Sequence, residues 1–251
     1  MPMKTTKPKI QIINLDVWYD YLHVLDMLSF TIHEGEVVSI IGPSGCGKST
    51  LLLYIGGLLR NKRGTVFIDQ GDVFDSSPNI SIIFQDLILF PWKTLRDNIL
   101  LGLKKEKIDK ETAIHRANQF IKKLNLSGFE NHYPSQLSGG MKQRAAIAQA
   151  YVSHSKLILM DEPFGSLDAL TRRNVQSALL QIIENHKKTV IMVTHDIDEA
   201  LLFSDRIIIL SQKPARIVAE IAVPFTRPRK HDLLMHKQAA FLKKNIFKLL
   251  E

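Results

Sequence analysis

The feature that most constrains the fold is a glycine-rich loop, "GPSGCGKST" (Gly42–Thr50), placed directly after a continuous apolar run. The run "VVSII" (Val37–Ile41) is typical of a strand buried on both faces, and "STLLLYIGGLLR" after the loop has helical spacing. A strand, a loop of the pattern G-x-x-x-x-G-K-[ST] and a helix in this order form a phosphate cradle, because the backbone N–H groups point at the anion. We therefore expect an α/β fold that binds a nucleotide.

Every position of this loop is expected to contact the nucleotide or its metal ion. Lys48 supplies a positive charge to the β- and γ-phosphates, Ser49 offers a hydroxyl to Mg²⁺, and Thr50 lies near the α-phosphate. The expected contacts are Gly42, Pro43, Ser44, Gly45, Cys46, Gly47, Lys48, Ser49 and Thr50. The alternative, a glycine turn beside a surface lysine, does not account for the strand before the loop and the helix after it.

Further apolar runs extend the sheet. They are Ser81–Phe84, Leu157–Met160, Val190–Val193 and Arg206–Leu210. Because helical segments separate several of these runs, a doubly wound α/β sheet is predicted. Residues 94–155 show helical pattern without a convincing strand, and "TLRD" at position 94 resembles a capping box. The chain is expected to end in a β-hairpin and an amphipathic helix, which is more often a packed surface helix than a membrane anchor.

Several predicted strands end in side chains that can bind a metal ion or take part in hydrolysis. "LILMDEP" ends in Asp161 and Glu162, "SIIFQD" in Gln85 and "VIMVTHD" in His195. Ligands of parallel sheets bind at this carboxyl edge. Asp161 is placed to hold Mg²⁺ through its water shell, and Glu162 to face a water that attacks the γ-phosphate. Gln85 can reach the metal or that water, and His195 can hydrogen-bond the γ-phosphate.

A second glycine-rich segment, "LSGGMKQR" (Leu137–Arg144), lies in the helical region. Glycines behind a serine at a helix start favour phosphate binding, because bare N–H groups and the positive end of the helix dipole meet there. The segment has no lysine for a β-phosphate and follows no strand. Two chains placed head to tail would each sandwich a nucleotide between one phosphate loop and Ser138, Gly139 and Gly140 of the other.

The ordered set "GPSGCGKST", "FQD", "LSGGMKQR", "LMDEP", "SLD" and "VTH" resembles the ATP-binding subunit of ABC transporters, over about residues 10–223. The resemblance implies ATP and Mg²⁺ as cofactors, ATP hydrolysis and a nucleotide-sandwich homodimer. It implies that Glu162 is the general base and His195 the switch residue, and it places Asp168 at the dimer seam. An aromatic residue upstream of the loop stacks on adenine in this family, and Tyr19 matches best, with Trp18 as the fallback.

The resemblance also implies a P-loop NTPase fold with a mostly parallel core sheet, an antiparallel β portion and a helical insertion subdomain. The expected boundaries are 1–93 for the first part of a RecA-like core with an N-terminal β portion, 94–155 for the helical signature subdomain, 156–225 for the second core part and 226–251 for a helical tail. One position departs from the family pattern, because Met141 stands where glutamine is commonest.

The segment "DLILFPWKTLRDNI" is similar to subunits that import nitrate, taurine, aliphatic sulfonates or the pyrimidine precursor of thiamine. In that family the region borders the groove that receives a coupling helix, so Phe90 and Trp92 are expected to suit a hot spot for the permease. The partners implied are a second copy, a separate integral membrane permease pair and, indirectly, a solute-binding protein. The alternatives are a soluble ABC ATPase and an exporter-type subunit.

Composition limits the remaining choices. The net charge of +8 suits an anionic partner, although a merely basic surface fits equally well, and no nucleic acid is expected. A single cysteine excludes a disulfide framework and a cysteine-based zinc site. The start shows no signal peptide and no apolar run reaches the roughly 18 residues of a spanning helix. The expected location is peripheral, at the cytoplasmic face of the inner membrane.

Overall fold

The computed structural model describes residues 7–60, 63–75 and 79–250, and the chain divides into two compact units. Unit 1 holds residues 1–78 and 187–251, and unit 2 holds residues 79–186. The basic start, residues 1–6, over which a signal peptide is not expected, lies outside the described residues. None of the helices described is both long and apolar enough to cross a membrane.

Unit 1 begins with an antiparallel sheet, which is the antiparallel portion that the fold class requires. Its strands are β1 (Pro8–Tyr19), β2 (Leu22–His33), β4 (Thr65–Ile68) and β5 (Gly71–Asp72), in the order β2-β1-β4-β5. Strands β1 and β2 form a long hairpin in which Ile12 pairs with Phe30 and Trp18 pairs with His23. Several register shifts interrupt this ladder, so the burial of side chains does not alternate cleanly along either strand.

The second sheet region of unit 1 is mostly parallel. Its strands are β3 (Val37–Ile41), β8 (Thr189–Val193), β9 (Arg206–Leu210) and β10 (Ile217–Ala222). Strand β3 pairs in parallel with β8 and with β9, and β9 pairs with β10 as the predicted terminal hairpin. Every residue of β3 and β8 is buried, which explains why both strands are continuous apolar runs rather than alternating ones.

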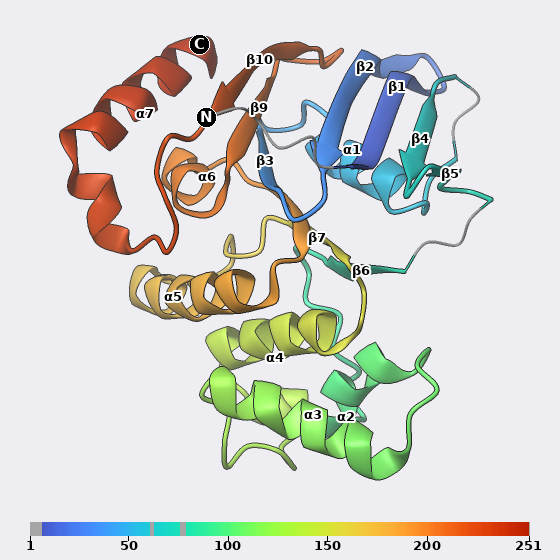
Figure 1. Ribbon diagram of the computed structural model, residues 1–251, viewed down its shortest axis with the longest axis vertical. Helices are drawn as coiled ribbons and strands as arrows, with labels where there is room; N and C mark the ends of the chain where they lie inside the picture. Colours follow the sequence, from blue (N-terminus) through green and yellow to red (C-terminus); the bar gives the residue numbers. More distant parts are fainter. Residues whose placement is uncertain (1–6, 61–62, 76–78, 251) are drawn as a thin grey trace. The chain divides into compact units, whose positions relative to one another are not determined.

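Helices cover this parallel region. They are α1 (Lys48–Ile55), α6 (Ile197–Phe203), the short 3₁₀ helix η3 (His231–Met235) and α7 (Lys237–Leu250). Figure 1 shows α6 between α7 and strands β3 and β9, and a cluster that includes Ile41, Leu201 and Ile246 fills the space between them. The predicted tail helix is therefore confirmed, and it packs as a surface helix through Ala239 and Ile246.

Unit 2 combines a parallel strand pair with helices. The strands are β6 (Ile80–Ile83) and β7 (Leu157–Asp161), which lie side by side in parallel. The helices are α2 (Leu95–Leu100), η1 (Leu101–Leu103), α3 (Lys110–Lys123), η2 (Pro134–Gln136), α4 (Gly139–Val152) and α5 (Ala169–His186).

Residues 94–155, all of which the structure describes, form helices and loops without a strand, as predicted. Thr94 caps α2 because its hydroxyl oxygen accepts a hydrogen bond from the backbone N–H of Asp97 at 3.2 Å, as the capping-box pattern indicated. The strands and helices confirm the predicted fold class. The domain boundaries at 93, 155 and 225 stay a prediction.

Candidate active site

The glycine loop of unit 1 begins where β3 ends and leads into α1. Gly45 and Gly47 have φ values of 76° and 117°, a left-handed backbone that glycine adopts readily. A Cβ atom at Gly47 would lie 2.8 Å from Val24 Cγ1, and one at Gly42 would lie 2.9 Å from the Leu210 carbonyl oxygen. Gly47 therefore requires glycine on both conformational and steric grounds, whereas Gly45 requires it on conformational grounds and Gly42 on steric grounds.

Lys48 lies inside this loop with 5% of its surface exposed. Its ammonium group donates hydrogen bonds of 2.9 Å to the carbonyl oxygens of Gly42 and Pro43. Ser44 and Ser49, in contrast, are exposed. The loop thus concentrates positive charge and backbone N–H groups at the start of a helix, an arrangement suited to phosphate oxygens.

Cys46 is also buried within the loop, with 2% exposure. Burial raises the pKa of its thiol, so the side chain is neutral and packs inward. The Cys46 backbone N–H donates to the Pro43 carbonyl at 3.3 Å. The predicted contact of Cys46 with a nucleotide stays a prediction, and it would involve the backbone rather than the buried thiol.

His195 is the other strand-end residue of unit 1. It follows β8, and the backbone N–H of the preceding Thr194 donates to the Ile40 carbonyl of β3 at 3.2 Å. Since β3 and β8 are parallel neighbours, His195 and the glycine loop leave the same edge of the sheet. The His195 side chain is exposed there.

Of the two aromatic residues expected to stack on adenine, Trp18 packs within the β1–β2 hairpin. Its ring stacks on His23 with a centroid distance of 4.0 Å, and its indole N–H donates to the Asp16 carboxylate at 3.1 Å. Trp18 and Tyr19 are exposed to a similar degree, at 47% and 44%. Burial raises the pKa of Tyr54 in α1, and Tyr19 adds to that rise.

Unit 2 gathers the other strand-end residues. Ile83 of β6 pairs with Met160 of β7, so Gln85 and the acidic pair Asp161 and Glu162 leave the same edge of this strand pair. Asp161 is 8% exposed. Glu162 has a φ of 41°, a strained conformation for a side chain of this size and one that recurs at functional sites.

The donor set predicted for Mg²⁺ is chemically suitable. Ser49 offers a hydroxyl, Gln85 an amide carbonyl and Asp161 a carboxylate, all hard oxygen donors of the kind that Mg²⁺ prefers. Asp161 is a buried carboxylate at a strand end, and such a group is costly to bury unless cations or donors balance it. The residues present therefore fit this ion.

The second glycine-rich segment begins helix α4 in unit 2. The Ser138 hydroxyl oxygen accepts a hydrogen bond from the Met141 backbone N–H at 3.3 Å and caps the helix. Since Met141 takes part through its backbone, the missing glutamine leaves this cap intact. Gly139 is exposed, whereas a Cβ at Gly140 would lie 2.3 Å from Thr171 Cγ2 in α5.

Asp168 caps the neighbouring helix α5. Its carboxylate oxygen Oδ1 accepts a hydrogen bond from the Thr171 backbone N–H at 3.0 Å, and this bond lowers the pKa of Asp168. The family resemblance assigned Asp168 to a dimer seam. That role stays a prediction, whereas the cap is a local reason for aspartate at this position. Sequence reasoning missed both this cap and the packing of Thr171 on Gly140.

A glycine cradle with an internal lysine, built between a buried strand and a helix, defines a P-loop nucleoside triphosphatase. The sequence profile described as "ABC transporter" matches residues 25–165, which is more than half of the chain. The chain belongs to the ABC transporter family, as one of its ATP-binding, ATP-hydrolysing subunits.

Relatives agree over most of the length. The chain is 41% identical over 227 residues to an uncharacterised ABC transporter ATP-binding protein of Methanocaldococcus jannaschii, covering 89% of this chain and 85% of that protein. It is 44% identical over 214 residues to the aliphatic sulfonates import ATP-binding protein SsuB of Bacillus cereus, covering 84% of each.

Solved structures confirm the fold. An ATP-binding cassette in a dimeric post-hydrolysis state bound to ADP and Pi matches with a TM-score of 0.76 and 34% identity, covering 86% of this chain and all of that chain. The protein CbiO1 of Clostridium perfringens, part of the ABC transporter complex CbiONQ, matches with a TM-score of 0.77 at 24% identity, covering 95% of each chain, and this likeness supports the fold alone.

Proposed function

We propose that this subunit hydrolyses ATP to power the uptake of a small nutrient, of the small-anion, sulfonate or pyrimidine type, through a separate pair of permease subunits. It works as a homodimer at the cytoplasmic face of the inner membrane, and a solute-binding protein delivers the nutrient to the permease. The name of the Bacillus cereus relative, which specifies aliphatic sulfonate import, supports the import direction.

The proposed chemistry is in-line attack of a water on the γ-phosphate. Glu162 accepts the proton of the water while the new O–P bond forms and the bond to the β-phosphate oxygen breaks, so ADP leaves with the electron pair. Lys48, whose ammonium lies within the loop, stabilises charge on the phosphate oxygens. His195 hydrogen-bonds the γ-phosphate, and Gln85 orients the water. Tyr19 stacks on adenine.

Mg²⁺ bound to the nucleotide would neutralise charge on the β- and γ-phosphates. Ser49, Gln85 and Asp161 are the residues proposed to hold it. The remaining contacts come from the loop backbone, whose left-handed glycines direct N–H groups inward.

The second cradle is proposed to act on the nucleotide of a second copy. Ser138 and Gly139 are exposed at the start of α4, and Asp168 is exposed at the start of α5. Two helix starts that pack against each other at Gly140 and Thr171 offer N–H groups and helix dipoles on one face of unit 2. The dimeric form of a solved relative supports this arrangement.

The observation that carries the transport proposal is an exposed aromatic pair beside a groove in unit 2. Phe90 and Trp92 are 37% and 70% exposed, and their rings meet edge to face with centroids 5.3 Å apart. The groove measures about 310 Å³, and Phe84, Ile88, Phe90, Leu101 and Lys105 contribute to its lining. A groove of mixed apolar and polar lining beside two exposed aromatic rings suits a short amphipathic helix of a partner.

A buried asparagine holds this aromatic pair in place. Asn98, fully buried in α2, accepts a hydrogen bond from the Phe90 N–H at 2.7 Å. Its amide nitrogen donates to the carbonyl oxygens of Phe90, Lys93 and Thr94 at 3.0–3.2 Å. The loop is thus built to present exposed aromatic rings, which is expected of a docking surface.

The test is purification of the subunit from its native membranes in mild detergent, followed by mass spectrometry of what accompanies it. The wild-type chain is expected to bring down a protein with several membrane spans. A Phe90→Ala, Trp92→Ala variant is expected to lose that protein while the purified subunit keeps its ATP hydrolysis. Phe241→Ala, which removes an exposed ring on α7 of unit 1, is the matched control and should keep it.

Two results would count against the proposal. Recovery of the wild-type subunit only from the soluble fraction, with no permease, would favour a soluble ABC ATPase. A permease retained equally by the aromatic variant and the control would show that Phe90 and Trp92 are not the docking site.

A further inference from the structure

A buried hydrogen bond lies directly beside His195 in unit 1. The Thr194 hydroxyl donates to the Glu199 carboxylate at 2.6 Å, and the two residues are 1% and 6% exposed. None of the chemistry assigned above uses either side chain. A buried carboxylate is costly unless donors satisfy it, so its presence beside a reactive histidine calls for a physical reason.

The same hydroxyl also fixes the backbone that follows His195. Thr194 Oγ1 accepts a hydrogen bond from the Asp196 backbone N–H at 3.0 Å. On the near side, the Thr194 N–H donates to the Ile40 carbonyl at 3.2 Å. The histidine therefore lies between two backbone anchors, and one hydroxyl links the residue before it to the amide after it.

Helix α6, which carries Glu199, is itself held firmly at both ends. Asp196 caps its start by accepting hydrogen bonds from the backbone N–H groups of Asp198 and Glu199 at 2.8 and 3.3 Å. At its end, the Ser204 hydroxyl bonds Ser39 of β3, and Arg229 donates to the Leu201 carbonyl at 3.1 Å.

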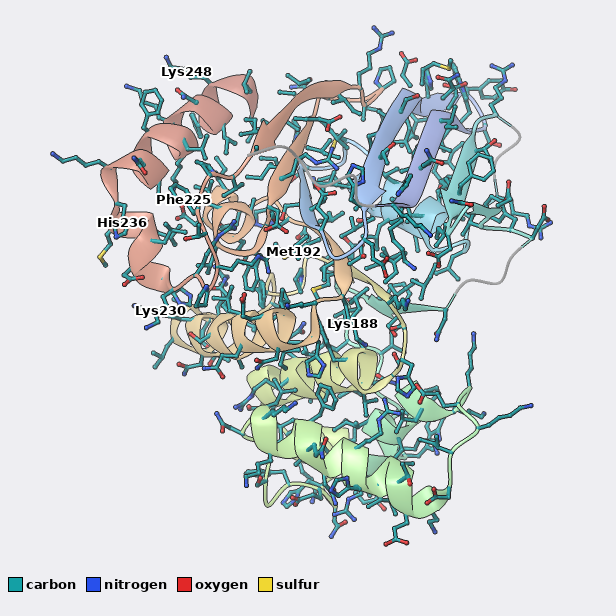
Figure 2. All side chains as sticks on the ribbon, viewed as in Figure 1. Lys188, Met192, Phe225, Lys230, His236 and Lys248 are labelled. Atoms are coloured by element: carbon teal, nitrogen blue, oxygen red, sulfur yellow. The ribbon has the colours of Figure 1, made fainter. Side chains whose placement is uncertain are left out.

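The packing of α6 makes this support rigid. Ile197, Ala200 and Leu201 are buried against β3, β9 and α7. In Figure 2, Met192 marks β8 two residues before Thr194, and Phe225 marks the segment that packs against the same cluster. Glu199 is therefore fixed to the body of unit 1, and Thr194 ties the histidine backbone to it.

From these contacts we infer that Thr194 and Glu199 are positioning residues that set the orientation of His195 toward the γ-phosphate. This inference rests on the role proposed for His195. Both side chains are buried. Their effect passes through the backbone on either side of the histidine, and an error of about 1 Å in a reacting group lowers turnover by up to about 10²-fold.

The first test is Thr194→Val, which removes the hydroxyl and keeps the branched shape. We expect kcat for ATP hydrolysis to fall about 10- to 100-fold with KM for ATP unchanged, because the phosphate loop is untouched. Thr194→Ser keeps a hydroxyl and is expected to restore most of the rate. Glu199→Met, which removes the acceptor and keeps the bulk, should match Thr194→Val, and Thr226→Val on an exposed threonine is the control.

A double variant separates positioning from general stability. Combined with His195→Ala, Thr194→Val should cause little further loss, because both changes remove the same contribution. In NMR spectra of protein labelled at histidine, Thr194→Val should shift or broaden the His195 ring signals and leave those of His231 and His236 unchanged.

The results distinguish failure of the inference from failure of the role proposed for His195. Normal kcat in Thr194→Val, full additivity with His195→Ala, or loss of folding in both Thr194→Val and Glu199→Met would overturn the inference. Normal hydrolysis in His195→Ala alone would remove the proposed role of His195. A rate lost in His195→Ala but kept in Thr194→Val would remove only the positioning role.

Discussion

The two glycine-rich helix starts of this chain look alike in sequence and differ in construction. In unit 1, Gly47 precedes α1 with a φ of 117° and no side-chain cap, and Lys48 bonds the carbonyls of its own loop. In unit 2, Ser138 caps α4 with its own hydroxyl, and a Cβ at Gly139 would meet only Leu167 Cδ2, at 3.9 Å.

The first cradle has its phosphate-binding groups within one unit, whereas the second cradle is open and lacks part of them. Left-handed glycines and a buried lysine lie together within a single unit, where we expect the phosphates to bind. The start of α4 has its helix cap satisfied locally and leaves Ser138 and Gly139 exposed, so it needs another surface to become a site. In the proposed homodimer that surface is the phosphate loop of the second copy.

The largest expected effect comes from removing the proposed general base, which should also hold the two cradles together in an ATP-bound dimer. Glu162→Gln removes the proposed general base, so we expect ATP hydrolysis to fall about 10²–10⁴-fold while ATP binding persists. With hydrolysis blocked, ATP should drive the variant to a dimer in size-exclusion chromatography, and adding Gly139→Ala should weaken that dimer. Near-normal turnover would show that the base is another residue, and an ATP-bound monomer would break the pairing of the cradles.

The next effect separates the glycines within the first cradle. Gly47→Ala combines a left-handed φ with a Cβ 2.8 Å from Val24 Cγ1, so we expect at least a tenfold loss of ATP affinity by calorimetry. Gly45→Ala has a φ of 76° and open space around its Cβ, so its penalty is limited to about 1–2 kcal/mol of backbone strain. Equal effects of the two variants would contradict this account.

The second cradle offers a cleaner matched pair. A Cβ at Gly140 would lie 2.3 Å from Thr171 Cγ2, so Gly140→Ala should lower the free energy of unfolding by about 1–3 kcal/mol. Gly139→Ala meets no close contact and should leave unfolding unchanged while lowering hydrolysis about tenfold, if the exposed face meets a nucleotide. Chemical denaturation and steady-state assays check both, and the reverse pattern would make Gly139 the structural glycine.

Features that follow from local sequence pattern could be predicted from the sequence. The phosphate loop, the strands around it and the strand-end residues follow from local pattern, because buried parallel strands are continuous apolar runs. The predicted runs Val37–Ile41 and Val190–Val193 lie fully within β3 and β8. The signature helix and the capping by Thr94 follow in the same way from residue types at helix starts.

Other features depend on contacts between distant residues, which a single sequence does not contain. The β1–β2 hairpin was expected only as an antiparallel portion, since register shifts and left-handed residues such as Asn14 and Met27 break its alternation. Asn98 gives no sign in sequence of the four hydrogen bonds it makes to the loop that carries Phe90. The same is true of Thr171 against Gly140.

The smallest expected effect is on stability, and it comes from removing the caps of α4 and α5, the two helices that pack together in unit 2. The Thr171 N–H, and then its hydroxyl, lower the pKa of Asp168, so the folded value lies below the unfolded one. Its contribution to stability is therefore present above the unfolded value, near 3.9, and is lost as pH falls through the folded pKa. The Ser138 hydroxyl does not titrate, so Ser138→Ala should cost about 0.5–2 kcal/mol at any pH.

Thermal unfolding of Asp168→Ala, Ser138→Ala and the wild type at pH 7 and pH 3 checks this contrast. The difference between wild type and Asp168→Ala should shrink at pH 3, because protonation removes the charge that the Thr171 N–H stabilises, whereas the difference for Ser138→Ala should persist. A pH-independent difference for Asp168→Ala would mean that its carboxylate charge does not contribute to the cap. Equal stability of Asp168→Ala and the wild type at both pH values would leave the proposed dimer seam as the reason for this exposed aspartate, which would sharpen the case that the open cradle is completed by a second copy.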